Sequence, residues 1–98
     1  WAREPEVVAS INQRHENQVY LPGCPLSPNV VATNDLQQFD GCDAWLVVTP
    51  AQHMRGVLAQ APECGRPLIL CSKGIEERSG QLLNHVAREV CPTASVMV

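Results

Sequence analysis

Short apolar runs recur along the chain and predict a sheet. They occupy residues 30–33, 44–49, 67–72 and 95–98, and such runs are typical of strands inside a parallel sheet. Helical segments separate the last three runs, so strands and helices alternate along the chain. This order indicates the α/β class with right-handed crossovers. We expect the last three strands to pair in chain order, and the strand at residues 67–72 to be buried on both faces.

Helical periodicity is clearest between the last two strands. Apolar residues recur there with the spacing of one helix face, at Leu82, Leu83, Val86, Ala87 and Val90. A second helix is expected after Pro50, with Val57 and Leu58 facing inward and its end between residues 62 and 65. Both helices would connect neighbouring parallel strands.

The sequence pattern of the N-terminal third of the chain predicts less regular structure. A helix should begin at Pro5, because proline suits the first helical turn, and run to Arg14. Residues 16–29 hold three prolines and show no periodicity, so we predict a connecting loop there. Asp35 can cap a brief helix that runs to Phe39.

The strand at residues 67–72 is the most informative element because Lys73 follows it directly. A lysine in this place puts its ammonium at the carboxyl edge of the sheet, where ligands bind in open α/β folds. Gly74 gives the turn behind the lysine conformational freedom. His53 comes shortly after another strand end, whereas His15 and His85 are expected to be surface histidines. We therefore predict that Lys73 binds a ligand and does not merely end a strand.

The composition argues against several function classes. The 98 residues make at most one small domain, and a net charge of −3 without a basic run argues against nucleic acid and anionic membranes. No apolar run approaches the roughly 20 residues that a membrane span needs. The histidines show no metal-ligand spacing, and neither a G-x-G-x-x-G turn nor a P-loop is present. We expect a small-molecule ligand, and no metal, nucleic acid or membrane partner.

The cysteines bear on the cellular compartment. There are five, an odd number, and no two form a C-x-x-C pair, so the sequence indicates neither a disulfide framework nor a zinc site. Buried, reduced thiols in a cytoplasmic protein are the expectation.

Four short motifs occur in order along the chain. They are His-Glu-Asn at residues 15–17, Tyr-Leu-Pro-Gly at 20–23, Val-Thr-Pro-Ala-Gln at 48–52 and Ser-Lys-Gly-Ile-Glu at 72–76. Together they resemble the NAD(P)-dependent glycerol-3-phosphate dehydrogenases of the bacterial type, and the resemblance covers the whole chain. Each motif alone is weak, but four in this order and at these spacings are specific.

The resemblance implies that residues 1–98 are part of an N-terminal NAD(P)-binding domain with a Rossmann-type, doubly wound parallel sheet. The first strand of the family and its glycine-rich turn would precede Trp1. Its catalytic lysine and helical substrate domain would follow Val98, so we expect this chain alone to be inactive. The implied reaction of the whole enzyme is hydride transfer between NAD(P)H and C2 of dihydroxyacetone phosphate or glycerol 3-phosphate, for glycerophospholipid synthesis. A homodimer, if one forms, would use the C-terminal domain.

The resemblance also implies roles for individual residues. Arg3 matches the position that contacts the adenosine end of the cofactor, and Pro50 and His53 match the turn beside it. Lys73 matches the lysine that reaches both cofactor and substrate. General chemistry agrees, because an arginine fork can bind the 2′-phosphate of NADP and an ammonium can hold an oxygen where charge develops. The choice between NAD and NADP stays open.

Two other interpretations remain. A dehydrogenase of the 6-phosphogluconate or hydroxyacid type would share the cofactor but act on another substrate, and the pair Tyr-Leu-Pro-Gly and Ser-Lys-Gly argues against it. A non-catalytic α/β module would bind NADPH tightly without turnover. One mild departure from the family pattern is Thr49, where a valine is usual.

Overall fold

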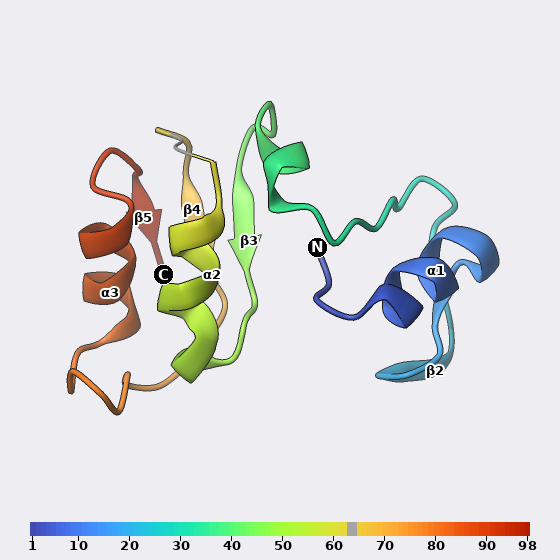
Figure 1. Ribbon diagram of the computed structural model, residues 1–98, viewed down its shortest axis with the longest axis horizontal. Helices are drawn as coiled ribbons and strands as arrows, with labels where there is room; N and C mark the ends of the chain where they lie inside the picture. The colour runs from blue at the N-terminus through green and yellow to red at the C-terminus, as the bar shows by residue number, and fades with distance from the viewer. Residues whose placement is uncertain (63–64) are drawn as a thin grey trace. The chain divides into compact units, whose positions relative to one another are not determined.

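Three parallel strands form a sheet in the computed structural model, which describes residues 1–62 and 65–98 (Figure 1). The strands are β3 (Trp45–Val47), β4 (Leu68–Leu70) and β5 (Val96–Met97), and they pair in the order β3-β4-β5. Trp45 aligns with Leu68, and Leu68 with Val96. The α/β class and the expected pairing order are confirmed.

Two compact units make up the chain, Trp1–Gln38 and Phe39–Val98, called here the N-terminal and C-terminal units. The C-terminal unit contains the sheet and two helices, α2 (Met54–Gln60) and α3 (Leu83–Val90), as well as the short 3-10 helix η2 (Ala51–His53). Both helices cover the same face of the sheet (Figure 1). The helix after Pro50 was expected to end between residues 62 and 65, but α2 ends at Gln60, because Ala61 precedes a proline and is extended.

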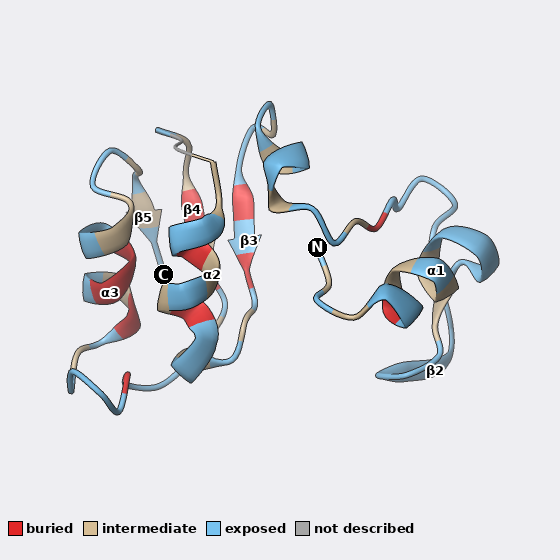
Figure 2. Cartoon of the chain, viewed as in Figure 1, coloured by how far each residue is buried: buried red, intermediate tan, exposed pale blue. Residues whose placement is uncertain are grey.

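The core of the C-terminal unit lies between the sheet and these two helices (Figure 2). Alternate residues of β3 and β4 face inward, as the two-residue period of a strand requires. Each helix contributes residues four positions apart, which lie on one helix face. These inward residues are Trp45, Val47, Leu68 and Leu70 from the strands and Met54, Leu58, Leu83 and Ala87 from the helices.

Two burial expectations were wrong in part. Leu68 and Leu70 are buried but Ile69 is only half-buried, and Leu46 on β3 is 68% exposed. The cause is that α2 and α3 both cover one face of the sheet. Leu82 was expected on the inner face of α3, but it precedes the helix as its N-cap and is exposed.

The N-terminal unit begins with α1 (Pro5–Arg14), as expected, and continues into a small antiparallel hairpin. Its strands are β1 (Glu16–Asn17) and β2 (Leu21–Pro25). The prediction of a loop over residues 16–29 was therefore wrong in part. The residues of β2 are all exposed, and its sequence Leu-Pro-Gly-Cys-Pro contains two prolines and a glycine, which are not typical of a strand.

Residues 30–33 do not form the expected strand. Their backbone is held by a side chain instead of a neighbouring strand. The amide of Asn12 donates to the Ala32 carbonyl at 2.9 Å, and the Ala32 N–H donates to Asn12 Oδ1 at 2.7 Å. The Ala2 N–H adds a bond to the Thr33 carbonyl. These partners satisfy both backbone groups of Ala32 and the carbonyl of Thr33 in place of a strand ladder.

The brief helix after Asp35 is confirmed as the 3-10 helix η1 (Leu36–Phe39). Asp35 caps it through Oδ1, which accepts a hydrogen bond from the Gln37 N–H at 3.0 Å. In the described part of the chain, no helix is long and apolar enough to cross a membrane.

The cysteines depart from the expected burial. Cys24 and Cys71 are exposed, while Cys42 and Cys91 are half-buried. Cys64 lies outside the described range. The expectation of uniformly buried thiols was therefore wrong.

Candidate functional site

The loops that follow β3 and β4 meet at the carboxyl edge of the sheet. Ser72, beyond the end of β4, donates its hydroxyl to the carbonyl oxygens of Val47 at 3.3 Å and Thr49 at 2.5 Å. The Cys71 N–H donates to the Val47 carbonyl at 2.9 Å and extends the strand pairing towards the loop. The two loops are thus joined where the strands end.

A single side chain joins the same loops a second time. The amide nitrogen of Gln52 donates to the Ile75 carbonyl at 2.9 Å, and its oxygen accepts from the Glu77 N–H at 2.9 Å. This amide therefore pairs with the backbone on both sides of Glu76. Two residues of the loop after β4, Lys73 and Gly74, lie between Ser72 and Ile75, where the two attachments are made.

Lys73 and Gly74 lie between these attachments, and both are exposed. Gly74 has a φ of +119°, a conformation that side-chain-bearing residues rarely adopt. A Cβ built on Gly74 would lie 3.7 Å from the Cβ of Ala51, so the turn packs beside the residue that follows Pro50. The predicted need for a flexible residue behind Lys73 is confirmed.

The structure brings three of the four predicted site residues to one unit. Pro50 and His53 are exposed at the start and end of η2, directly after β3. Lys73 follows β4, on the loop that Ser72 and Gln52 join to this turn. Arg3 is exposed in the N-terminal unit, two residues before α1, and is described there by itself.

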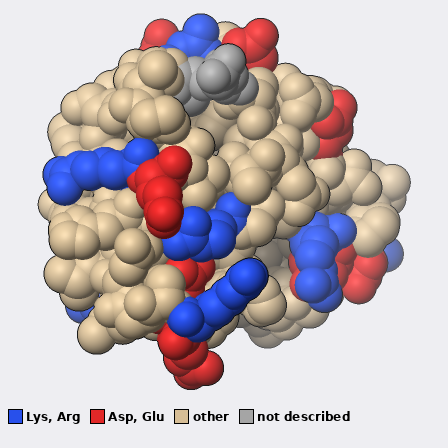
Figure 3. All heavy atoms as spheres, turned by 60° about the vertical axis from the view of Figure 1, so that its left-hand side comes forward, with Lys and Arg blue, Asp and Glu red and all other residues tan. Residues whose placement is uncertain are grey.

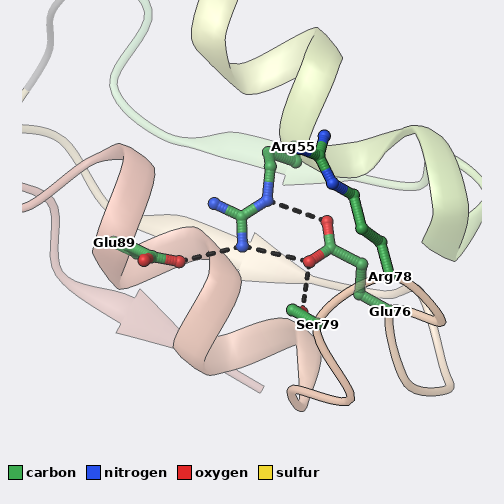
Figure 4. Close-up of a pocket in the computed structure, with 5 residues that line it drawn as sticks. All are labelled: Arg55, Glu76, Arg78, Ser79 and Glu89. Atoms are coloured by element: carbon green, nitrogen blue, oxygen red, sulfur yellow. Dashed lines mark hydrogen bonds and ion pairs between the residues drawn. The ribbon is translucent and has the colours of Figure 1, made fainter.

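One ion pair, formed by a buried glutamate and a half-buried arginine, adjoins this edge, and the sequence did not reveal it. Glu76 is 5% exposed and receives both arms of the Arg55 guanidinium (Figure 4). Arg55 Nε lies 2.9 Å from Oε1, and Nη2 lies 3.0 Å from Oε2. The Ser79 hydroxyl also donates to Oε2, and Glu89 contacts Nη2 at 2.8 Å. A hollow of about 300 Å³ adjoins these residues and Arg78.

This arrangement holds the carboxylate of Glu76 in its charged form. Donation from Arg55, and then from Ser79, lowers the pKa of Glu76 from 4.5 to about 2. The same contact with Glu76, followed by that with Glu89, raises the pKa of Arg55. Both side chains are consequently charged and mutually neutralised over the ordinary pH range.

Charges of both signs lie next to one another on the face shown in Figure 3. In the ranges 1–62 and 65–98, no cluster of three histidine, cysteine, aspartate or glutamate side chains could hold a metal ion. The Thr49 hydroxyl is buried at the loop junction and has no hydrogen-bond partner in the structure.

A parallel sheet whose strand ends carry two joined loops defines an α/β domain of the open-sheet class, in which ligands bind at the carboxyl edge. The chain belongs to the family described as the N-terminus of NAD-dependent glycerol-3-phosphate dehydrogenase, which it matches over residues 1–98. The family resemblance noted in the sequence is confirmed.

Curated relatives agree with this membership. The chain is 50% identical over 98 residues to glycerol-3-phosphate dehydrogenase [NAD(P)+] of Erythrobacter litoralis, covering 100% of the chain and 30% of that protein. It is also 50% identical over 100 residues to the protein of the same name from Caulobacter vibrioides, covering 99% of the chain and 30% of the relative. The chain therefore spans about 30% of the length of these relatives.

Solved structures confirm the partial Rossmann-type fold. DsGPDH of Dunaliella salina superposes with a TM-score of 0.83 at 30% identity, over 98% of this chain and 20% of that one. Glycerol-3-phosphate dehydrogenase of Plasmodium falciparum gives a TM-score of 0.80 at 28% identity, over 96% of this chain and 29% of that one.

Proposed function

We propose that residues 1–98 form part of the cofactor-binding domain of an NAD(P)-dependent glycerol-3-phosphate dehydrogenase. The observation that supports this proposal is the match to relatives of this name, which covers the whole of this chain. The proposed reaction interconverts dihydroxyacetone phosphate and glycerol 3-phosphate by hydride transfer, and provides glycerol 3-phosphate for glycerophospholipid synthesis in the cytoplasm. A homodimer, if one forms, would use parts of the protein beyond this chain.

Three of the proposed binding residues, Pro50, His53 and Lys73, follow the ends of β3 and β4, at the edge where an open-sheet fold binds ligands. Pro50 and His53 would line the cofactor, because they form the exposed turn after β3. Arg3 would contact the adenosine end. The exposed ammonium of Lys73 would reach both the cofactor and the substrate from the neighbouring loop.

Lys73 can do specific chemistry in this place. The bound nicotinamide would supply the hydride that reduces C2 of dihydroxyacetone phosphate. Negative charge then develops on the C2 oxygen, and a lysine ammonium is a compact donor that can stabilise it. The joined loops would hold the ammonium in position before the reaction, so that little reorganisation is needed.

The test uses the full-length protein that contains this chain. Oxidation of NADPH and NADH is followed with dihydroxyacetone phosphate, in the wild type and in Lys73→Ala. We expect turnover in the wild type and a loss of about 10²- to 10³-fold in the variant, typical of removing a donor to developing charge. Arg88→Ala, which removes an exposed cation from α3, is the matched control and should keep full activity.

Two results would contradict the proposal at different points. A folded wild-type protein that binds NADPH but does not turn over dihydroxyacetone phosphate would favour the non-catalytic module. A Lys73→Ala protein with an unchanged circular dichroism spectrum and activity within about threefold of wild type would remove Lys73 from the site.

A further inference from the structure

The loop that carries Lys73 is short and attached on both sides. Ser72 holds one side through the carbonyl oxygens of Val47 and Thr49. On the other side, Ile75 and Glu77 pair with the amide of Gln52. With its neighbours held in this way, the backbone of Lys73 has little freedom to move along the sheet edge.

One helix face provides the second attachment. Gln52 and Arg55 lie three positions apart in the continuous segment of η2 and α2, so their side chains project from the same face. Gln52 binds the backbone on either side of Glu76, and Arg55 binds the Glu76 carboxylate. The segment that follows the turn after β3 therefore fixes the loop after β4.

Glu76 is unusual among the charged residues of this loop because it is buried. Its side chain is 6% exposed, whereas Lys73 and Glu77 are exposed. A bidentate contact with arginine fixes both the position and the orientation of a carboxylate. Ser79 satisfies the same carboxylate from within the loop, and the Glu76 N–H donates to the Gln81 carbonyl at 2.9 Å. Glu76 is thus held by its side chain and by its backbone.

We propose that Glu76 is a positioning residue that acts through Lys73. Its carboxylate is bound by Arg55, and its chain neighbours on both sides are bound by Gln52. Glu76 thereby fixes the position of the loop at the sheet edge, and with it the position of Lys73 three residues earlier. This inference rests on the proposed role of Lys73 as the residue that holds the substrate oxygen. Glu76 itself contacts neither substrate nor cofactor in this account.

A double-mutant cycle in the full-length protein tests this inference. The set comprises the wild type, Glu76→Gln, Lys73→Ala and the double variant, assayed with dihydroxyacetone phosphate and NADPH. Misplacing a catalytic group by about 1 Å can cost about 100-fold. We expect Glu76→Gln to lower kcat/KM by about tenfold to 100-fold, mainly through kcat. In the Lys73→Ala background the same change should cost less than about twofold, because the group that it positions is gone.

Two further variants separate the positioning effect from a folding defect: a second test, Gln52→Ala, and a control, Asp40→Asn. Gln52→Ala removes both backbone attachments from an exposed position, so it tests the same mechanism without uncovering a buried charge. Its effect should also vanish in the Lys73→Ala background. Asp40→Asn breaks a separate ion pair with Arg66, whose atoms lie 3.8 Å apart, and should leave kcat/KM unchanged.

Each outcome separates this inference from the proposed function. If Lys73→Ala is severe and the Glu76→Gln loss is equally large in both backgrounds, the role of Glu76 is purely structural and the positioning role is wrong. If Glu76→Gln and Gln52→Ala both keep wild-type kcat/KM, the positioning role is also wrong, although Lys73 can still bind substrate. If Lys73→Ala keeps full activity, the assignment of Lys73 fails and the positioning role fails with it.

Discussion

The Ser72 hydroxyl donates a hydrogen bond of 2.5 Å to the carbonyl oxygen of Thr49, and so ties the loop after β4 to the loop after β3. The same hydroxyl lies 3.3 Å from the Val47 carbonyl. These contacts give a structural role to the serine between β4 and Lys73. The Ser72 hydroxyl continues the contact between the two chain segments beyond the last backbone hydrogen bond of β3 and β4.

Ser72→Ala should loosen this edge. Loss of a hydrogen bond to a buried carbonyl costs about 1 kcal/mol, which corresponds to roughly a fivefold increase in local opening. Hydrogen–deuterium exchange of peptides that cover residues 70–77 measures this directly. Ser95→Ala, at an exposed position before β5, is the control and should leave the exchange of these peptides unchanged. Equal exchange in wild type and Ser72→Ala would show that other contacts hold the loop.

The sequence predicted the sheet and helices of the C-terminal unit because their apolar residues follow simple periods. Trp45 and Val47 are two positions apart and both face the core. Leu83 and Ala87 are four positions apart and lie on one helix face. No such pattern exists in the hairpin of the N-terminal unit, where Glu16 Oε1 accepts from the Gly23 N–H at 3.0 Å. Side-chain contacts of this kind specify structure without periodicity, so sequence reasoning missed the hairpin.

Gly74 and Gly56 should respond in opposite ways to alanine. Gly74 has a φ of +119°, so Gly74→Ala should destabilise the loop by about 1 kcal/mol or more and lower activity by displacing Lys73. Gly56 lies in α2 with open space around its Cβ position. Gly56→Ala should therefore stabilise the protein by about 0.5–1 kcal/mol, because glycine is the poorer helix former.

Thermal unfolding and kcat/KM of both alanine variants provide the measurement. Built on Gly74, the new Cβ would lie 3.7 Å from Ala51, an ordinary contact, so any loss there reports backbone strain and not a clash. If Gly74→Ala matched the wild type in both Tm and activity, the loop would have to adopt another backbone path readily.

The pair of Glu76 and Arg55 predicts a specific acid sensitivity. The pKa of Glu76 is lowered from 4.5 to about 2 by Arg55 first and Ser79 second. Between these pH values the unfolded chain binds more protons than the folded one, so this contribution to stability decreases as the pH falls. It is fully present above pH 4.5 and is lost on approaching pH 2.

Glu76→Gln should consequently flatten the decline of Tm over this acidic range, while it lowers Tm at neutral pH. Glu77→Gln, which changes an exposed neighbour, is the matched control and should keep the wild-type slope. Parallel acid profiles for the wild type and Glu76→Gln would mean that other carboxylates govern the acid sensitivity.

Residues of the candidate site could be predicted from the sequence only where they directly follow an apolar strand. Lys73 could be found because an apolar strand runs into it, and the turn from Pro50 to His53 because it follows another strand. Arg55 and Glu76 could not, because they are 21 positions apart and no motif links them. The three-residue spacing of Gln52 and Arg55 places both on one helix face, but it does not indicate their partners. The partners are known only from the structure, where the loop after β4 packs beside this helix face.

Arg3 should decide how well the full-length protein uses NADPH. Its side chain is exposed two residues before α1, and its guanidinium offers a fork suited to a 2′-phosphate. The neighbouring carboxylate of Glu4 could select NADH, but its Oε1 accepts a hydrogen bond from the Tyr20 hydroxyl at 2.9 Å. This bond also raises the pKa of Tyr20 and engages Glu4 within the unit. We therefore expect the wild type to use both cofactors.

Arg3→Ala should lower kcat/KM with NADPH by about tenfold or more and change the value with NADH by less than about twofold. The reason is that a charge-assisted hydrogen bond contributes about 1.5–3 kcal/mol and only NADPH carries the 2′-phosphate. Arg14→Ala is the matched control, since it removes another exposed guanidinium of the same unit, one that donates to Gln18 at 3.3 Å. It should leave the ratio of the two kcat/KM values unchanged. If Arg3→Ala leaves that ratio unchanged as well, Arg3 does not contact the 2′-phosphate, and selectivity between the cofactors is set by other residues.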